Sequence, residues 1–260
     1  MSMTCSRVKY MENKLVALVP ARLGSKRVTG KSLRLLNKKP LISYCIDALK
    51  ETAYFSDICI NSDSELYEQV ALRESVKFYK RRPELATSES LIDDYIYDFV
   101  LHTDADYLAI VNPTSPFVTS DEYDRAWEQY RNGDCDTLLS CERIQTHCFY
   151  QGIPVNFDRD GQHPRSQDLE PLLALNFAIT IINCEKYRQN YEKHQWGLYT
   201  GTLGFFETSG IGSIDIDYEE DFQLAEFMSQ FMEAQSSNEF SKEYDPIIQP
   251  LIDSGRDISN

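Results

Sequence analysis

Basic side chains gather in one short loop near the beginning of the chain. An apolar run leads into this loop in the segment LVALVPARLGSKRVTGKS, Leu15–Ser32. The loop carries four cations: Arg22, Lys26, Arg27 and Lys31. If the apolar run is the first strand of an open α/β sheet, its carboxyl end is where such sheets bind ligands. Cations there would suit a nucleoside triphosphate and a departing pyrophosphate, and a solvated basic loop without a role is the alternative.

The end of the loop, Gly30-Lys31-Ser32, has the composition of the end of a P-loop. A Walker A loop needs the spacing G-x-x-x-x-G-K-[ST], because its successive N–H groups converge on one phosphate. Here Ser25 stands where the first glycine is required, and Gly24 comes one place too early. No strand elsewhere ends in an obvious Walker B carboxylate, the magnesium-binding partner of a Walker A loop. The sequence therefore disfavours a P-loop NTPase, which would turn over ATP or GTP without an acceptor.

Two aspartates, Asp215 and Asp217, alternate with isoleucines in GSIDID. On a strand their side chains leave the same face, with Cα atoms about 6.6 Å apart, so they could share one Mg²⁺ and leave room for waters and phosphate. On a helix they would diverge by about 200°, and the alternating isoleucines favour the strand. The alternative is an acidic edge before a helix, whose first turn favours acids. Three further acids are interpreted as such helix-start residues: Glu219, Glu220 and Asp221.

The elements that must position these groups follow an alternating pattern. Short apolar segments alternate with segments of helical spacing, which is typical of a doubly wound, mostly parallel α/β sheet. Strands are predicted at 14–20, 57–62, 76–81, 106–113 and 136–143. Helices are predicted at 40–51, 64–74, 90–102 and 120–132, the last with Ser120 as its N-cap.

The pattern changes after residue 143. A segment rich in turns and aromatic residues predicts an excursion from the sheet, within about 144–210. A buried strand at 175–184, an edge strand at 203–208 and the acidic strand at 212–217 are expected next, followed by a helix at 218–232. The polar ends, 1–13 and 233–260, are expected to be flexible tails.

Composition excludes several classes of function. The net charge of −15 over 260 residues argues against nucleic-acid binding, which depends on cationic side chains, and against anionic membrane surfaces. The polar start has no signal-peptide core, and no apolar run is long enough to span a membrane. The seven cysteines show no metal-binding spacing, which indicates reduced thiols. We therefore expect a cytoplasmic protein.

The segment VPARLGSKRVTGKSLRLLNKKPLI closely resembles the signature of the acylneuraminate cytidylyltransferase family, the CMP-sialic acid synthetases and their relatives. The resemblance continues in the family's order through INSDSELYEQVA, RRPELAT, VNPTSPF, PRSQDL and GSIDIDYEEDFQLAE, and covers nearly all of residues 14–231. It implies a Rossmann-like nucleotidyltransferase domain over this range. The implied reaction transfers CMP from CTP to the anomeric hydroxyl of a 2-keto-3-deoxy sugar acid of the sialic type, releases pyrophosphate and supplies surface glycan synthesis.

The resemblance also implies roles for individual residues on the CTP side. The implied catalytic residues are Arg22, Lys26, Lys31, Asp215 and Asp217, with Mg²⁺ held by the two aspartates. The implied CTP-binding residues are Pro20, Ala21, Arg22, Gly24, Ser25, Lys31, Ser32, Arg82, Pro83 and Ala86. Ser32 stands where the family usually has asparagine, which removes one amide from this side.

The acceptor side departs further from the family. The implied sugar-binding residues are Asn112, Thr114, Ser115, Arg165 and Asn176. Asn112 replaces a glutamine, and in the family's Asn-Gly-Ala-Ile-Tyr strand Phe177 replaces the glycine and Thr180 the tyrosine. Arg165 matches the arginine that in relatives reaches the sugar carboxylate, a bidentate partner. The acceptor therefore stays open between a nonulosonic acid, an octulosonic acid and another acid such as a phosphonate.

In relatives, the part that corresponds to the excursion forms a dimerisation arm that reaches towards the partner's active site. The excursion and the segment after it are rich in aromatic residues, so a homodimer is expected. A different class of function is a catalytically silent, CTP-binding subunit. The charged residues retained at the implied site argue against it, because decay usually removes stability-costly charges first.

Overall fold

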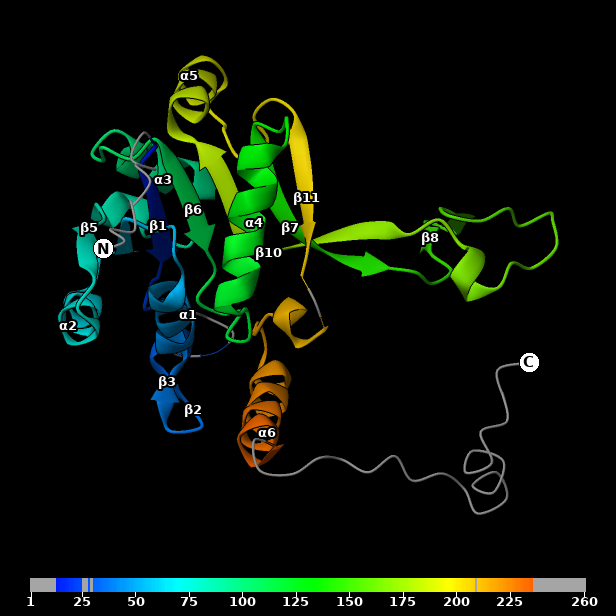
Figure 1. Ribbon diagram of the computed structural model, residues 1–260, viewed down its shortest axis with the longest axis horizontal. Helices are drawn as coiled ribbons and strands as arrows, with labels where there is room; N and C mark the ends of the chain where they lie inside the picture. The colour runs from blue at the N-terminus through cyan, green and yellow to red at the C-terminus, as the bar shows by residue number, and fades with distance from the viewer. Residues whose placement is uncertain (1–12, 25–27, 29, 209, 236–260) are drawn as a thin grey trace, which may run out of the picture.

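The computed structural model describes residues 13–24, 28, 30–208 and 210–235, and centres on a seven-stranded sheet (Figure 1). The strand order is β11-β7-β10-β6-β1-β4-β5. The strands are β1 Leu15–Pro20, β4 Asp57–Ser62, β5 Lys77–Lys80, β6 Tyr107–Val111, β7 Thr137–Ile144, β10 Leu172–Asn183 and β11 Leu203–Glu207. Only β10 is antiparallel to its neighbours, β6 and β7. The predicted doubly wound, mostly parallel sheet is confirmed.

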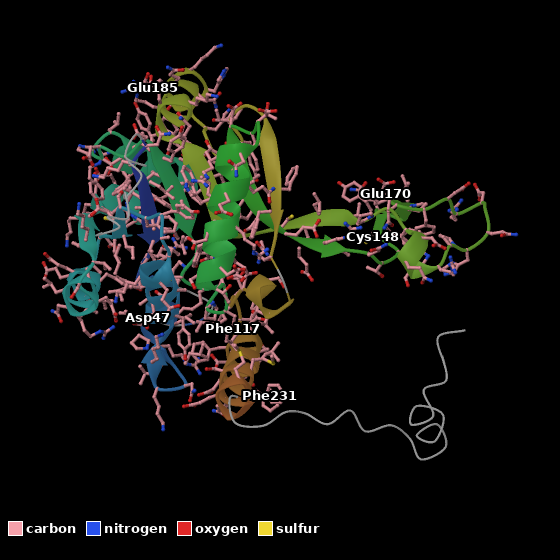
Figure 2. All side chains as sticks on the ribbon, in the orientation of Figure 1. Asp47, Phe117, Cys148, Glu170, Glu185 and Phe231 are labelled. Atoms are coloured by element: carbon pink, nitrogen blue, oxygen red, sulfur yellow. The ribbon has the colours of Figure 1, made fainter. Side chains whose placement is uncertain are left out.

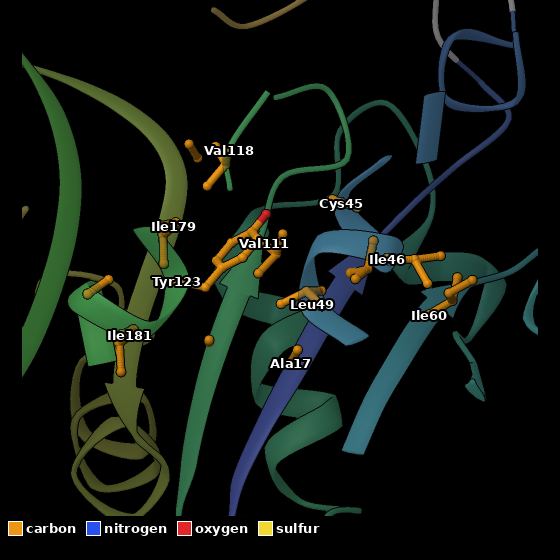
Figure 3. Close-up of a cluster of buried hydrophobic side chains, with 14 of the residues drawn as sticks. Ala17, Cys45, Ile46, Leu49, Ile60, Val111, Val118, Tyr123, Ile179 and Ile181 are labelled. Atoms are coloured by element: carbon orange, nitrogen blue, oxygen red, sulfur yellow. The ribbon is translucent and has the colours of Figure 1, made fainter. Parts of the chain in front are cut away.

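Helices cover both faces of the sheet because successive strand residues point to opposite sides. In β1, Leu15, Ala17 and Val19 pack with α1 Leu41–Glu51, α2 Glu65–Glu74 and α4 Ser120–Asn132. Val16 and Leu18 pack on the other face with α3 Ile92–Val100 and α5 Cys184–His194. Figure 3 shows the first cluster, in which Ala17, Ile60 and Val111 of the strands lie near Ile46 and Leu49 of α1. The chain therefore folds into three layers.

A third, smaller core lies beyond the carboxyl end of the sheet. Helix α6, Glu219–Gln235, packs there with the hairpin of β2 Leu35–Leu36 and β3 Lys39–Pro40 (Figure 1). Its buried centre includes Leu36, Phe117, Ile216 and Phe222. This small core fixes the segment between β11 and α6, which includes both predicted acidic residues.

Most predicted elements are present, and four differences stand out. Helix α5 was not predicted, and α6 continues to Gln235, inside the expected tail. The cap of α4 is Thr119 rather than Ser120, because Thr119 and Glu122 form a reciprocal capping box. The predicted strand at 212–217 is wrong: Gly210–Ser213 form a 3₁₀ turn, and residues 214–217 after it belong to no strand.

An arm projects from one side of the sheet (Figure 1). It begins where β7 and β10 continue as a two-stranded ribbon, Cys141–Ile144 against Leu172–Leu175. The arm also contains β8 Phe149–Tyr150, β9 Ile153–Pro154 and the 3₁₀ turn η3 Ser166–Asp168. Figure 2 shows Cys148 and Glu170 on it, away from the sheet. The first part of the turn-rich excursion predicted after residue 143 is thus an arm that projects from the domain.

Two further expectations, on membrane-spanning helices and on cysteines, can be compared with the described residues. None of the helices among those residues is long and apolar enough to cross a membrane. The six cysteines within the described ranges are all free thiols, as expected from their spacing, and Cys5 lies outside the described residues. The basic residues Lys26 and Arg27, together with Ser25, also lie outside them.

Candidate functional site

Two adjoining cavities open at the carboxyl ends of β1 and β6. We call the smaller, of about 340 Å³, the apolar cavity, and the larger, of about 500 Å³, the polar cavity. They share five lining residues, Pro20, Ala21, Arg22, Ser88 and Asn112, and form one cleft. From β1 the chain proceeds outwards through β4 and β5, then returns to the other side of β1 as β6. The cleft thus lies at the point where strand order reverses, where open α/β sheets bind ligands.

The polar cavity brings the two predicted acids to one of the predicted cations. The Nζ of Lys31 lies 3.2 Å from Oδ1 of Asp217 and donates to the carbonyl oxygen of Ile216. Oδ1 of Asp215 accepts hydrogen bonds from the Thr114 hydroxyl and, at 3.3 Å, from the Asn112 amide. Residues from three segments, distant in sequence, therefore meet in one site.

The acids share a face although they do not lie on a strand. Ile216 is fully buried in the small core beside α6, and its N–H donates to the carbonyl oxygen of Thr114 at 2.9 Å. The side chains on either side of Ile216, those of Asp215 and Asp217, line the polar cavity instead. The backbone N–H groups of Asp217 and Tyr218 both donate to Oδ2 of Asp221. Asp221 thus stabilises the turn into α6, in keeping with its interpretation as a helix-start residue.

Burial raises the pKa of Asp215, and the neighbouring charge of Asp217 raises it further. The hydrogen bond from Thr114 and the charge of Lys31 act in the opposite direction but do not cancel the shift. Two close carboxylates with one lysine leave negative charge that a divalent cation would neutralise. Mg²⁺ typically takes one or two protein carboxylates and completes its shell with water and phosphate oxygens, so the donor set fits this ion.

Side chains of the described residues do not by themselves make up a complete metal site. Among residues 13–24, 28, 30–208 and 210–235, no three His, Cys, Asp or Glu side chains are arranged to hold a metal ion. A metal at Asp215 and Asp217 would therefore need oxygen ligands from the substrate or from water.

The basic loop is anchored at both of its described ends. The N–H of Ala21 donates to the carbonyl oxygen of Asn61, and the guanidinium of Arg22 donates to that of Thr87, each at 2.9 Å. Gly30 has a φ of 60°, a left-handed conformation that glycine adopts without strain, and it begins the 3₁₀ turn η1 Lys31–Leu33. This turn aims Lys31 at the cleft. Gly24 is exposed, and it does not line either cavity.

The apolar cavity contains an arginine that the sequence interpretation missed. Arg81 is 3% exposed, donates to the side chain and backbone of Asn61, and lies 4.1 Å from the centre of the Tyr95 ring. Burial lowers the pKa of Arg81 and raises that of Tyr95 to about 12. The apolar walls of this cavity are Leu85, Ile92, Tyr95, Ile110 and Phe177.

The predicted Arg82 lies elsewhere. It pairs with Asp98 at 3.0 Å and lines a separate cavity between α3 and α5. Alternation along the extended chain would have indicated Arg81, which shares a face with Tyr79, a residue that packs on the same core as α3. Pro83 and Ala86 belong to the following 3₁₀ turn and its cap and do not line the cleft, whereas Leu85, Thr87, Ser88 and Ser90 do.

The predicted acceptor residues separate into two groups. Asn112 and Thr114 lie in the cleft beside Asp215. Ser115 is buried behind it, and Asn176 is bound to Ser140 and Thr208 through its amide. Arg165 pairs with Asp168 on the arm, with its side chain exposed. A single chain therefore does not bring Arg165 or Asn176 into the cleft.

Phe177 lies in the cleft in a conformation that bulky residues rarely adopt. Its φ is 53°, at the point where the register between β10 and β7 shifts. A left-handed conformation costs a residue with a Cβ atom about 1–2 kcal/mol. The strain is held at a site wall, where it fixes an aromatic ring against the apolar cavity.

This strain predicts that a glycine variant at position 177 is more stable than an alanine variant, the reverse of the usual order in a strand. Phe177→Gly should unfold with a free energy about 1 kcal/mol higher than Phe177→Ala, because glycine alone relieves the left-handed backbone. Ala178→Gly, one residue along the same strand, serves as the matched control and should be less stable than the wild type by about 0.5–1 kcal/mol. Urea denaturation measures all three variants, and a Phe177→Ala variant as stable as Phe177→Gly would contradict the strain.

Comparison with known proteins agrees with this geometry. The family profile described as cytidylyltransferase matches residues 16–169. The N-acylneuraminate cytidylyltransferase of Streptococcus agalactiae serotype V is 31% identical over 218 residues, which cover 80% of this chain and 52% of the relative. The CMP-N,N'-diacetyllegionaminic acid synthase of Legionella pneumophila is 33% identical over 228 residues, covering 82% of this chain and 95% of the relative. This chain thus spans about half of the streptococcal relative.

The fold also has a counterpart among solved structures. The CMP:2-keto-3-deoxy-manno-octonic acid synthetase complexed with CTP superposes with a TM-score of 0.66 at 17% identity, over 84% of this chain and all of that one. At this identity the likeness concerns the fold, which is the same three-layer arrangement around a mostly parallel sheet.

Proposed function

Because the chain belongs to the cytidylyltransferase family, we propose that it transfers CMP from CTP to the anomeric hydroxyl of a 2-keto-3-deoxy sugar acid and releases pyrophosphate. One observation carries the proposal. Arg22 and Lys31 lie in the same polar cavity as Asp215 and Asp217, and this cavity opens into an apolar one. Cations for phosphates, acids for a metal and an apolar recess for a base are thus continuous, as nucleotidyl transfer requires.

The two cavities suggest the orientation of CTP. The apolar cavity, with a few polar groups from residues 87–90, suits the base and ribose. The triphosphate would then extend over the polar cavity towards Lys31. Arg81 lines the apolar cavity and can donate to the nucleotide there, since an arginine side chain stays charged at neutral pH.

The chain's own residues contribute positioning and charge. Lys31 and Arg22 would neutralise the triphosphate and the leaving pyrophosphate, which is most of what a protein can add to phosphoryl-group chemistry. Asn112 and Thr114 hold one oxygen of Asp215, so this carboxylate keeps its direction. Asp215 and Asp217 would hold Mg²⁺, which when bound would polarise the α-phosphate.

The acceptor is proposed from the relatives' chemistry. The streptococcal relative is named for N-acylneuraminate and the Legionella relative for N,N'-diacetyllegionaminic acid. We propose a related nonulosonic acid, with an octulosonic acid or a phosphonate as the alternative. The altered residues on the acceptor side, Asn112 and Phe177 among them, support a preference of this chain's own. We also propose that such a product supplies surface glycan synthesis and that the protein acts in the cytoplasm.

The nucleotide half of the proposal has a direct test. Pyrophosphate release should be measured with CTP, UTP, ATP and GTP in magnesium buffer, with and without a mixture of 2-keto-3-deoxy sugar acids. We expect pyrophosphate release from CTP but not from UTP, ATP or GTP, and only when the sugar acids are present. Hydrolysis of ATP or GTP without an acceptor would favour a P-loop NTPase. Binding of CTP without turnover of any acceptor would favour the catalytically silent subunit.

We also propose that the protein acts as a homodimer through its arm. Four apolar side chains on the arm are each more than half exposed: Phe149, Tyr150, Ile153 and Val155. Arg165 lies on the same arm, where it pairs with Asp168, and it is not among the described residues that line the two cavities of the cleft. A second copy would both cover the apolar surface and place this arginine for a carboxylate.

A surface variant of the arm tests the dimer. The double variant Tyr150→Ser/Ile153→Ser should weaken self-association by about 30-fold or more if these side chains are central to the interface, because each is 68% exposed and contributes little to the monomer's own core. Light scattering coupled to size exclusion measures the effect. Leu72→Ser, at a side chain 75% exposed on α2, is the matched control and should leave the dimer intact. A monomeric wild type would contradict the proposal.

A further inference from the structure

One buried phenol joins two segments that carry the cations of the cleft. Tyr67, in the first turn of α2, is fully buried. Its hydroxyl lies 2.5 Å from the hydroxyl of Ser32 in η1 and donates to the carbonyl oxygen of Arg22 at 3.3 Å. These two contacts connect the loop that leaves β1 with the turn that begins at Lys31.

The proton positions follow from this arrangement. A hydroxyl has one proton to donate, so if Tyr67 donates to Arg22, Ser32 donates to Tyr67. Burial raises the pKa of the Tyr67 phenol, so the hydroxyl keeps its proton at neutral pH and stays a donor. The carbonyl oxygen of Arg22 can only accept a hydrogen bond, so the Tyr67 hydroxyl is the donor in this contact.

The contacts continue from both ends of this pair. The guanidinium of Arg22 donates to the carbonyl oxygen of Thr87, on the far side of the cleft. Lys31 adjoins Ser32 in the chain and reaches Asp217 and the carbonyl of Ile216. The Tyr67 hydroxyl is thus the point from which the positions of both cations are determined.

We propose that Tyr67 is a positioning residue of the nucleotide cleft, which sets the separation of Arg22 and Lys31 through its hydrogen bonds to the backbone of one segment and to Ser32 in the other. This inference rests on the proposed function, since it assumes that the two cations bind the phosphates of CTP. It also accounts for Ser32, where the family usually has asparagine: the buried phenol supplies a polar group opposite the shorter side chain.

The test compares CTP affinity among variants that keep the fold. Isothermal titration of CTP in magnesium buffer needs no acceptor. Tyr67→Phe retains the buried ring and removes the hydroxyl, and Ser32→Ala removes its partner. Each should raise the Kd for CTP by about fivefold to tenfold, the effect of one net hydrogen bond. Because both act through one contact, the double variant should bind no more than about twofold more weakly than Tyr67→Phe.

Tyr187→Phe is the matched control. Its hydroxyl is bound to Asp93 in the core between α3 and α5, and its ring is as buried as that of Tyr67. This variant should lower the melting temperature and leave the Kd for CTP unchanged.

The outcomes separate the two proposals. If the wild type binds CTP and Tyr67→Phe binds it equally well while melting earlier, the hydroxyl serves stability alone and the positioning role is wrong. Additive losses in the double variant would also overturn it, because the two hydroxyls would then act separately. If the wild type itself does not bind CTP, the proposed function fails first and the role of Tyr67 at a nucleotide site fails with it.

Discussion

Replacement of Asp217 or Asp215 by asparagine is expected to lower the rate of pyrophosphate release by about 10²–10³-fold or more, as the loss of a charge-stabilising group at a reacting phosphate does elsewhere. Asparagine keeps the shape of each side chain, and at position 215 it can still accept the hydrogen bonds from Thr114 and Asn112. It removes the charge with which the pair would hold Mg²⁺. The effect should therefore fall on catalysis rather than on folding.

The stability of Asp215→Asn should also show that its loss of activity does not come from a loss of folding. The raised pKa of Asp215 means that its ionised form is less favourable in the folded protein than in the unfolded chain. At neutral pH, Asp215→Asn removes this cost, so its melting temperature should equal or exceed that of the wild type. Such a trade of stability for activity is usual at functional sites.

The control for this prediction is Glu220→Gln. It removes one negative charge from the exposed start of α6, at a side chain that does not line the cleft. It should keep the wild-type rate. A rate within about threefold of the wild type for Asp215→Asn and Asp217→Asn would contradict their assigned roles, whatever the acceptor, because a lost transition-state contact has a larger effect.

Replacement of Lys31 by methionine is the second large effect expected. Methionine keeps the length and loses the charge that neutralises the triphosphate, so kcat/KM for CTP should fall by about 10²-fold. Lys31→Arg should recover part of this loss, because it keeps the charge but not the geometry of a compact ammonium group. Lys193→Met, at an exposed lysine of α5, is the control for a lost positive charge.

The result for Lys31 has to be separated from local disorder of the acidic segment. Lys31 donates to the carbonyl of Ile216 as well as to Asp217, so its loss frees both. Steady-state kinetics over a range of magnesium concentrations make the distinction. If the variant needs the same magnesium concentration but has a lower kcat/KM for CTP, Lys31 contacts a phosphate. If its rate returns at high magnesium, Lys31 merely organises the two aspartates.

The strands and most helices were predictable because their patterns are short and regular. β1, for example, alternates side chains between two cores and has no polar residue. α5 was missed for the opposite reason: its sequence CEKYRQNYEKH is almost entirely polar, and only Cys184, Tyr187 and Tyr191 are buried. These three positions have the i, i+3, i+7 spacing of one helix face, but one cysteine and two tyrosines among eight polar residues make that face a weak hydrophobic signal.

The acidic pair was predicted to share a face, and it does, although not on a strand. The alternation of Ile and Asp records which side chains are buried, and an extended segment produces this alternation with or without a neighbouring strand. The segment is held by the side chain of Ile216 and one backbone hydrogen bond to Thr114. Neither contact is visible in the local sequence, since Thr114 lies about 100 residues earlier.

The basic residues after β5 show the limit of motif alignment. Arg81 and Arg82 are adjacent, and in an extended chain a shift of one residue places a side chain on the opposite face. The motif alone suggested Arg82, whereas the structure places Arg81 against Tyr95 and the cleft. For Arg165 the reason is different: it lies on an arm that leaves its own domain, where it pairs with Asp168 rather than with a residue of the cleft.

The most direct test of the account is to identify the product. The protein should be incubated with CTP, magnesium and one 2-keto-3-deoxy sugar acid at a time, and the mixture analysed by mass spectrometry for a CMP ester together with pyrophosphate. We expect one acid to yield both in equal amounts, and Asp217→Asn to form both at a rate lower by about 10²–10³-fold or more. Pyrophosphate without a CMP ester, or no CMP ester from any acid while CTP is bound, would contradict the claim that this chain joins CMP to a sugar acid.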